Sequence, residues 1–168
     1  MTVPSIGTGF RGPDGNTGYL LRQTFQLFRA AMEETLREVG LTASQYSLLS
    51  AIDSQPGYSA AQLAKATVMT EQSVGELLGS LEKAGWVERR REHADRRVRL
   101  VHLTTAGSRV VAEATPRVRA VEYRMTAGLS EAEQRQFRTW LAVAACNLAG
   151  QPAAEGAEGA EGTGRTIA

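Results

Sequence analysis

Residues 70–107 read TEQSVGELLGSLEKAGWVERRREHADRRVRLVHLTTAG, and this stretch decides the fold. Thr70 and Gly85 bracket an amphipathic segment, because a hydroxyl residue before the first turn and a glycine after the last are common helix boundaries. The residues that follow predict two strands, 87–91 and 97–103, joined by a short connection. A threonine after the second strand begins another helix. The stretch therefore predicts a helix, a hairpin and a second helix in direct succession.

The predicted hairpin is dense in arginine. Guanidinium groups this close together repel one another unless an anion lies beside them. Exposed ion pairs with nearby carboxylates are worth only about 0–1 kcal/mol each and do not account for so many arginines. The ribbon therefore predicts contact with duplex DNA, although the net charge of the chain is only +1. The arginines are Arg89, Arg90, Arg91, Arg96, Arg97 and Arg99.

Two further helices precede this stretch. Thr42 with Gln45, and Ser59 with Gln62, have the spacing of capping boxes at helix starts. The gap at 67–69 is too short for anything but a sharp turn, so the last two helices before the hairpin form a helix-turn-helix. The predicted helices are 43–54, 60–66 and 71–84.

The flanking segments predict longer helices. Apolar residues recur every three or four positions over 19–39 and again within 105–148, where a Ser130–Glu133 capping box separates two helices. Their apolar faces exceed what the small central module can cover. Packing against a second copy, as a two-fold dimer, is the economical solution, and a bundle within one chain is the alternative.

The ends of the chain differ from the middle. Residues 1–18 are rich in glycine, proline and threonine and predict a flexible arm, whereas the Ala-Glu-Gly repeats of 149–168 predict a disordered tail. No segment has the apolar character of a signal peptide or a membrane span. A single cysteine, Cys146, gives no disulfide framework and suits a reducing cytoplasm. We therefore expect a cytoplasmic protein.

Catalytic and metal-binding chemistry has little support. His93, His102 and Cys146 make no plausible zinc set and no spacing that suggests a Cys–His pair. We expect no enzyme activity, no metal and no cofactor. Cys146 falls on an apolar helix face, where a buried inert thiol is favoured over a redox sensor.

The order of these elements and several sequence runs resemble the MarR family of winged helix-turn-helix transcription regulators. The resemblance implies a mainly α fold with a small β-wing. A winged helix-turn-helix core at about 42–104 would lie between dimerisation helices at about 19–39 and 105–148. The resemblance spans about 19–148, and the runs that carry it are 41–46, 62–64, 69–74, 81–89, 95–97 and 101–107.

The resemblance also implies how DNA is bound. A homodimer would place each recognition helix, 71–84, in a major groove of a pseudo-palindromic operator, with the wing at the adjacent minor groove. Arg97 matches the wing arginine of the family, and Asp95 matches the acid that orients it. The DNA-binding residues carried over are Ser59, Thr70, Gln72, Ser73, Glu76, Ser80, Lys83, Arg96 and Arg97.

The middle of the recognition helix departs from the family pattern. Members often carry a hydroxyl residue followed by Arg or Lys there, whereas this chain has Gly75, Glu76 and Gly79. Each glycine costs about 1 kcal/mol of helix propensity relative to alanine, and the glutamate repels phosphates. An alternative function follows: a ligand-binding or partner-binding dimer on the same scaffold with weak or lost sequence-specific DNA readout.

The family resemblance also implies a small-molecule effector. Phenolic or other lipophilic anions often bind MarR proteins between the dimerisation helices and the winged module, which usually relieves repression. Tyr19, Arg22, Tyr46 and Trp86 are candidates for such a pocket, since aromatic rings and one guanidinium suit an anion of this kind. The alternative is that Tyr46 only packs at a helix start and Trp86 only belongs to the core.

Overall fold

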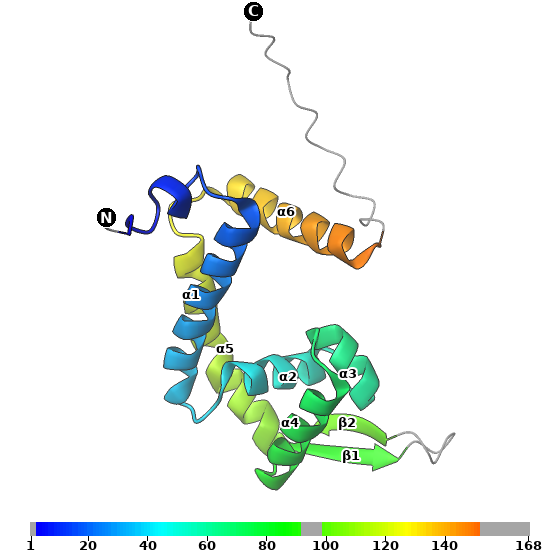
Figure 1. The fold of residues 1–168 in the computed structure, drawn as a ribbon. Coiled ribbons are helices and arrows are strands. Elements are labelled where there is room, and N and C mark those ends of the chain that lie inside the picture. Colours follow the sequence, from blue (N-terminus) through cyan, green and yellow to red (C-terminus); the bar gives the residue numbers. More distant parts are fainter. Residues whose placement is uncertain (1–2, 92–98, 152–168) are drawn as a thin grey trace, which may run out of the picture. The chain divides into compact units, whose positions relative to one another are not determined.

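The computed structural model describes residues 3–91 and 99–151 (Figure 1). It confirms the expected fold class: a mainly helical protein with one small antiparallel sheet. The predicted helix boundaries agree with the observed ones to within two residues. The elements are η1 (Gly9–Arg11), α1 (Thr17–Arg37), α2 (Ala43–Ser54), α3 (Ala60–Thr67), α4 (Glu71–Lys83), β1 (Val87–Arg91), β2 (Arg99–Leu103), α5 (Thr105–Met125) and α6 (Glu131–Ala149).

Side-chain caps place the helix starts where the sequence predicted them. At α2 the Thr42 hydroxyl accepts from the Gln45 N–H at 3.1 Å, and the Gln45 amide oxygen accepts from the Thr42 N–H at 2.9 Å. The same reciprocal box opens α3 at Ser59. At α4 the Thr70 hydroxyl accepts from the Ser73 N–H at 3.1 Å. Each cap satisfies backbone donors that the first turn of a helix leaves without partners.

The described chain divides into two compact units, Met1–Met125 and Thr126–Ala168. In the first unit, α1 runs beside α5, and the helix-turn-helix packs on α2 and the hairpin (Figure 1). Burying a leucine or valine side chain stabilises a fold by about 1.5–3 kcal/mol, so this core fixes α4 firmly. The largest fully buried side chains are Leu36, Leu48, Leu49, Ile52, Leu63, Leu78, Leu81, Val74 and Val101.

The hairpin is fastened to the helix-turn-helix along one edge. β1 and β2 pair antiparallel, from Val87 opposite Leu103 to Arg91 opposite Arg99. The other edge of β2 pairs with the turn before α3: Val101 donates its N–H to the Tyr58 carbonyl at 3.0 Å. The start of α3 and the hairpin therefore form one continuous backbone network.

A threonine joins three elements of the first unit. The Thr104 hydroxyl donates to the Gly85 carbonyl at 2.7 Å and accepts from the Gly107 N–H at 3.1 Å. Its own N–H donates to the Trp86 carbonyl at 3.0 Å. The end of α4, the beginning of β1 and the first turn of α5 meet at this residue.

The N-terminal segment has more structure than its composition predicted. Arg11 donates from Nε to the Gln23 Oε1 at 3.1 Å and from Nη1 to the Pro4 carbonyl at 3.1 Å. The Gln23 amide in turn donates to the Arg11 carbonyl at 3.3 Å. These contacts hold the segment against α1, whereas a flexible arm was expected over 1–18. Asn16 caps α1, so the helix begins at Thr17 instead of residue 19.

The second unit consists mainly of α6, which begins with the predicted Ser130–Glu133 capping box. No side chain of α6 is buried within the described structure, and Trp140 and Leu148 are 64% and 84% exposed. The expected tail lies almost wholly outside the described residues. Across the described ranges, no helix combines the length and apolar character needed to cross a membrane.

Candidate nucleic-acid interface

Helix α4 presents a polar face to solvent. Val74, Leu78 and Leu81 are fully buried, which fixes the rotation of the helix about its axis. The opposite positions must then point outward, because a helix repeats every 3.6 residues. These exposed positions are the predicted contact residues Gln72, Ser73, Glu76, Ser80 and Lys83, with Thr70 at the cap.

Hydrogen bonds along this face restrict its side chains. The Thr70 and Ser73 hydroxyls lie 2.8 Å apart, and the Ser80 hydroxyl donates to the Leu77 carbonyl at 2.7 Å. The Gln72 amide donates to the Glu76 carboxylate at 3.1 Å. Glu76 is therefore hydrogen-bonded to a neutral neighbour on the exposed face. Gln72 and Glu76 present acceptor oxygens suited to the amino groups of adenine and cytosine, respectively.

Ser59 lies at the N-terminus of α3 and beside the hairpin. Its N–H and hydroxyl both donate to the Gln62 Oε1, at 2.8 and 3.0 Å. Its backbone forms a bridge with Leu100 of β2. The residue is partly buried on the helix-turn-helix, and its hydroxyl is already occupied by the cap. Its predicted phosphate contact stays a prediction.

The arginines of the hairpin differ in their partners. The Arg89 Nε lies 3.1 Å from the Glu82 Oε1, which ties β1 to α4, and both side chains are about one-third exposed. The Arg90 Nε donates to Glu88 on its own strand at 3.1 Å. Arg91 and Arg99 are exposed and directly opposite each other. Asp95, Arg96 and Arg97 lie outside the described residues.

The four residues predicted to bind a ligand are not united by their side-chain contacts. The Arg22 guanidinium lies 5.4 Å above the Tyr19 ring, which also meets the Phe10 ring edge at 5.6 Å. The Tyr46 hydroxyl lies 3.3 Å from the Thr115 hydroxyl on α5. Trp86 is half-buried beside the Thr104 junction. The structure thus gives Tyr46 and Trp86 packing roles of their own.

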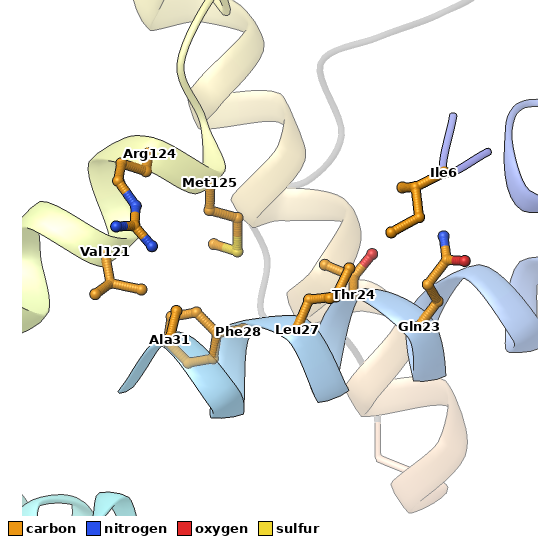
Figure 2. Close-up of a pocket in the computed structure, with 9 residues that line it drawn as sticks. All are labelled: Ile6, Gln23, Thr24, Leu27, Phe28, Ala31, Val121, Arg124 and Met125. Atoms are coloured by element: carbon orange, nitrogen blue, oxygen red, sulfur yellow. The ribbon is translucent and has the colours of Figure 1, made fainter. Parts of the chain in front are cut away.

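A cavity of about 310 Å³ lies elsewhere, between α1 and the end of α5 (Figure 2). Its walls are mostly apolar, and Figure 2 shows Arg124 and Met125 of α5 opposite Ala31 and Leu27 of α1. An apolar cavity with one guanidinium suits a small lipophilic anion. None of the four predicted ligand residues lines it. The lining is Ile6, Gln23, Thr24, Leu27, Phe28, Ala31, Val121, Arg124 and Met125.

The part of the chain that the structure describes contains no cluster of three or more histidine, cysteine or carboxylate side chains arranged to hold a metal ion. Cys146 is half-buried on α6.

Comparison with known proteins identifies the fold. The family model described as "MarR family" matches residues 39–98. The transcriptional regulator HosA of Escherichia coli O127:H6 is 37% identical over 117 residues, which cover 70% of this chain and 85% of HosA. Bordetella bronchiseptica BpsR, whose DNA binding is regulated by 6-hydroxynicotinic acid, has a TM-score of 0.72 at 28% identity, covering 77% of this chain and 93% of BpsR.

A DNA complex is also among the similar structures. The transcriptional repressor CouR, bound to a 23-mer DNA duplex, has a TM-score of 0.72 at 27% identity and covers 77% of this chain and 92% of CouR. These names describe regulators of transcription and not enzymes. Three observations point to the same family. They are the capped helix α4, the arginine-bearing hairpin attached to it, and the relative that matches over most of its length. The chain belongs to the MarR family of winged helix-turn-helix transcription regulators, which act by binding DNA.

Proposed function

We propose that this protein is a homodimeric repressor whose two α4 helices bind a pseudo-palindromic operator in major grooves about one helical turn apart. The observation that carries the proposal is the exposed polar face of α4 next to an arginine-bearing hairpin. The DNA contacts proposed are the residues that the family resemblance implied: Ser59, Thr70, Gln72, Ser73, Glu76, Ser80, Lys83, Arg96 and Arg97, with Asp95 orienting Arg97. Such a repressor would act in the cytoplasm.

The dimer proposal rests on exposed apolar side chains. Phe25 of α1 is 56% exposed, and Trp140 and Leu148 of α6 are 64% and 84% exposed. Apolar groups this large are normally covered when they recur along one helix face. A second copy is the proposed cover, since a two-fold dimer buries the same face of both chains.

A mobility-shift titration on the DNA upstream of the protein's own gene tests the repressor proposal. The titration uses two salt concentrations and a non-specific competitor duplex. A discrete, competitor-resistant complex is expected. Salt-sensitive smearing alone, on this DNA and on a genome-wide selection of fragments, would instead favour the alternative of a dimer that has lost sequence-specific readout.

Sedimentation of the full chain tests the dimer. Trp140→Glu places a charge on the apolar stripe of α6, and Ala142→Glu places the same charge off that stripe on the same helix. We expect the wild type and Ala142→Glu to sediment as dimers and Trp140→Glu to shift toward the monomer. A monomeric wild type at micromolar concentration would refute the proposal.

The effector proposal uses the cavity between α1 and α5. BpsR, a similar structure, has its DNA binding regulated by an aromatic carboxylic acid, and the cavity here places the Arg124 guanidinium among apolar walls. A planar aromatic anion of that size would bury its ring against Leu27 and Phe28 and pair its carboxylate with Arg124. Ligand entry would alter the packing of α1 on α5 and so disfavour the DNA-bound spacing of the α4 helices.

Ligand titrations of a preformed operator complex test this site. The probes are 6-hydroxynicotinate and salicylate, and the variants are Arg124→Gln and Arg119→Gln, an exposed arginine on the same helix. We expect at least one probe to dissolve the wild-type and Arg119→Gln complexes at concentrations that leave Arg124→Gln bound. Equal sensitivity of all three proteins would place the effector elsewhere.

A further inference from the structure

Some of the described arginines of the hairpin form ion pairs and others do not. Arg89 is paired with Glu82 of α4, and Arg90 with Glu88. Arg91 and Arg99 remain, and neither side chain forms an ion pair or a hydrogen bond with another described residue. They are direct cross-strand partners at the end of the ladder.

The pleat of the hairpin gives these two side chains a common direction. Residues of a strand alternate between faces, so Arg91 shares a face with Arg89, and Arg99 shares that face with Val101. Arg89 reaches Glu82 on α4 from this face. Arg91 and Arg99 therefore lie on the side of the hairpin that faces α4, on the same face as the buried Val101.

Among the described side chains, the two guanidinium groups face each other as like charges. Cβ atoms of directly opposite residues lie about 4.5–5.5 Å apart, and like charges at that spacing destabilise a sheet. Both side chains are exposed, so solvent weakens the repulsion but does not remove it. An anion between the two guanidinium groups turns this net repulsion into a net attraction. A phosphate fits best because each planar guanidinium can donate two hydrogen bonds to its oxygens.

We propose that Arg91 and Arg99 together bind one backbone phosphate of the duplex, beside the groove that α4 enters. The inference rests on the proposed DNA-binding function and adds a contact that reads no sequence. A phosphate held here sets the depth and register of α4, whereas base discrimination comes from α4 itself.

Salt dependence measures such a contact. Each neutralised phosphate contributes about 0.9 to the slope of log affinity against log salt concentration. A contribution of that size is worth about an eightfold change in affinity between 0.1 and 1 M salt. The double variant Arg91→Gln/Arg99→Gln should lower the slope by about 0.9 and weaken operator and non-specific duplexes by the same factor. Arg119→Gln, an exposed arginine of α5 outside the hairpin, is the control and should leave the slope unchanged.

The melting temperature of the DNA-free protein provides a second measurement, which should not fall when the affinity for DNA falls. Removing the repulsion should keep or raise the melting temperature of the DNA-free double variant while its affinity for DNA falls. A structural role, such as pairing with a carboxylate of the wing, predicts a lower melting temperature instead. Arg91→Lys/Arg99→Lys keeps both charges without the planar forks and should retain the wild-type slope with weaker binding.

Three results overturn the inference. An unchanged slope in the glutamine double variant removes the phosphate contact. A loss confined to the operator, with non-specific affinity intact, makes the pair base-reading. A melting temperature that falls with affinity makes the pair structural. A wild type that binds no duplex at all refutes the proposed function first, and the wild-type titration shows this before any variant is compared.

Discussion

The carbonyl oxygen of Trp86 lies 2.0 Å from the point where a β-carbon on Gly107 would stand. Gly107 is buried in the first turn of α5, and Trp86 is in the chain between α4 and β1. Glycine is required here because it lets the helix backbone approach the other backbone directly. Its N–H is also held by the Thr104 hydroxyl at 3.1 Å. The contact fixes where α5 departs from the winged module.

Gly107→Ala should therefore destabilise the protein, although alanine is the better helix former. The new methyl group meets backbone, which cannot rotate away, so we expect a loss of about 1–3 kcal/mol in unfolding free energy. Urea unfolding followed by circular dichroism measures it, with Gly75→Ala as the control. An unchanged midpoint for Gly107→Ala would mean that the junction relaxes freely.

Gly75→Ala and Gly79→Ala should act in the opposite direction. A β-carbon at either position meets no atom within 4 Å, and each replacement should raise stability by about 1 kcal/mol through helix propensity. Operator titration of the same variants then reports on DNA. Weaker binding by a more stable protein would show that the bare surface of α4 lies against the duplex, whereas unchanged binding would leave the glycines without a role in approach.

Val68→Gly should also stabilise the protein. Val68 ends α3 with φ at +54° and is 94% exposed, so the folded state strains a β-branched backbone and gains little packing in return. Relief of a left-handed conformation is worth about 1–2 kcal/mol, partly offset by the greater entropy of glycine in the unfolded chain. Val68→Asn should also raise the stability of the protein, and Val68→Ile should not. A lower melting temperature for both Gly and Asn would contradict the expectation.

The cap of α6 should give the second unit a dependence on acid. Hydrogen bonds from the Ser130 side chain and then its backbone N–H lower the pKa of Glu133 below its usual 4.5. A lowered carboxylate pKa stabilises the folded state above the unfolded pKa, and that contribution is lost as the pH falls through the folded pKa. Helicity of the wild type should thus fall below about pH 4.5 more than that of Glu133→Gln, whose amide still accepts both bonds. A carboxyl titration by NMR giving a Glu133 pKa above 4.5 would refute this.

Local signals were sufficient for much of the fold. Thr42 and Ser59 cap their helices through residues three positions away, so the sequence predicted those starts to the residue. The start of α1 was misjudged because its cap, Asn16, lies in a segment whose composition favours mobility. Arg11 holds that segment through a hydrogen bond to Gln23. The two residues are twelve positions apart, so the spacing of apolar residues along the sequence does not predict this contact.

The cavity was beyond sequence reasoning for a related reason. Leu27 and Phe28 form part of a helical stripe that resembles ordinary core, and Met125 ends a helix about one hundred residues later in the chain. Only tertiary packing leaves space between them. None of the aromatic residues predicted to bind a ligand lines this cavity, and the Tyr46 hydroxyl contacts the Thr115 hydroxyl on α5. Their role in ligand binding stays a prediction. DNA contacts in the wing, at 95–97, stay predictions.

The junction at Thr104 attaches the first turn of α5 to the winged module. A helix of 21 residues is about 31 Å long at 1.5 Å per residue. One end is clamped to the winged module, and the other end forms a wall of the cavity with Arg124 and Met125. A tilt of about 6° pivoting at the cavity end moves the clamped end by roughly 3 Å over that length. Because Thr104 holds the end of α4, the beginning of β1 and the first turn of α5, such a displacement would move α4 and β1 together.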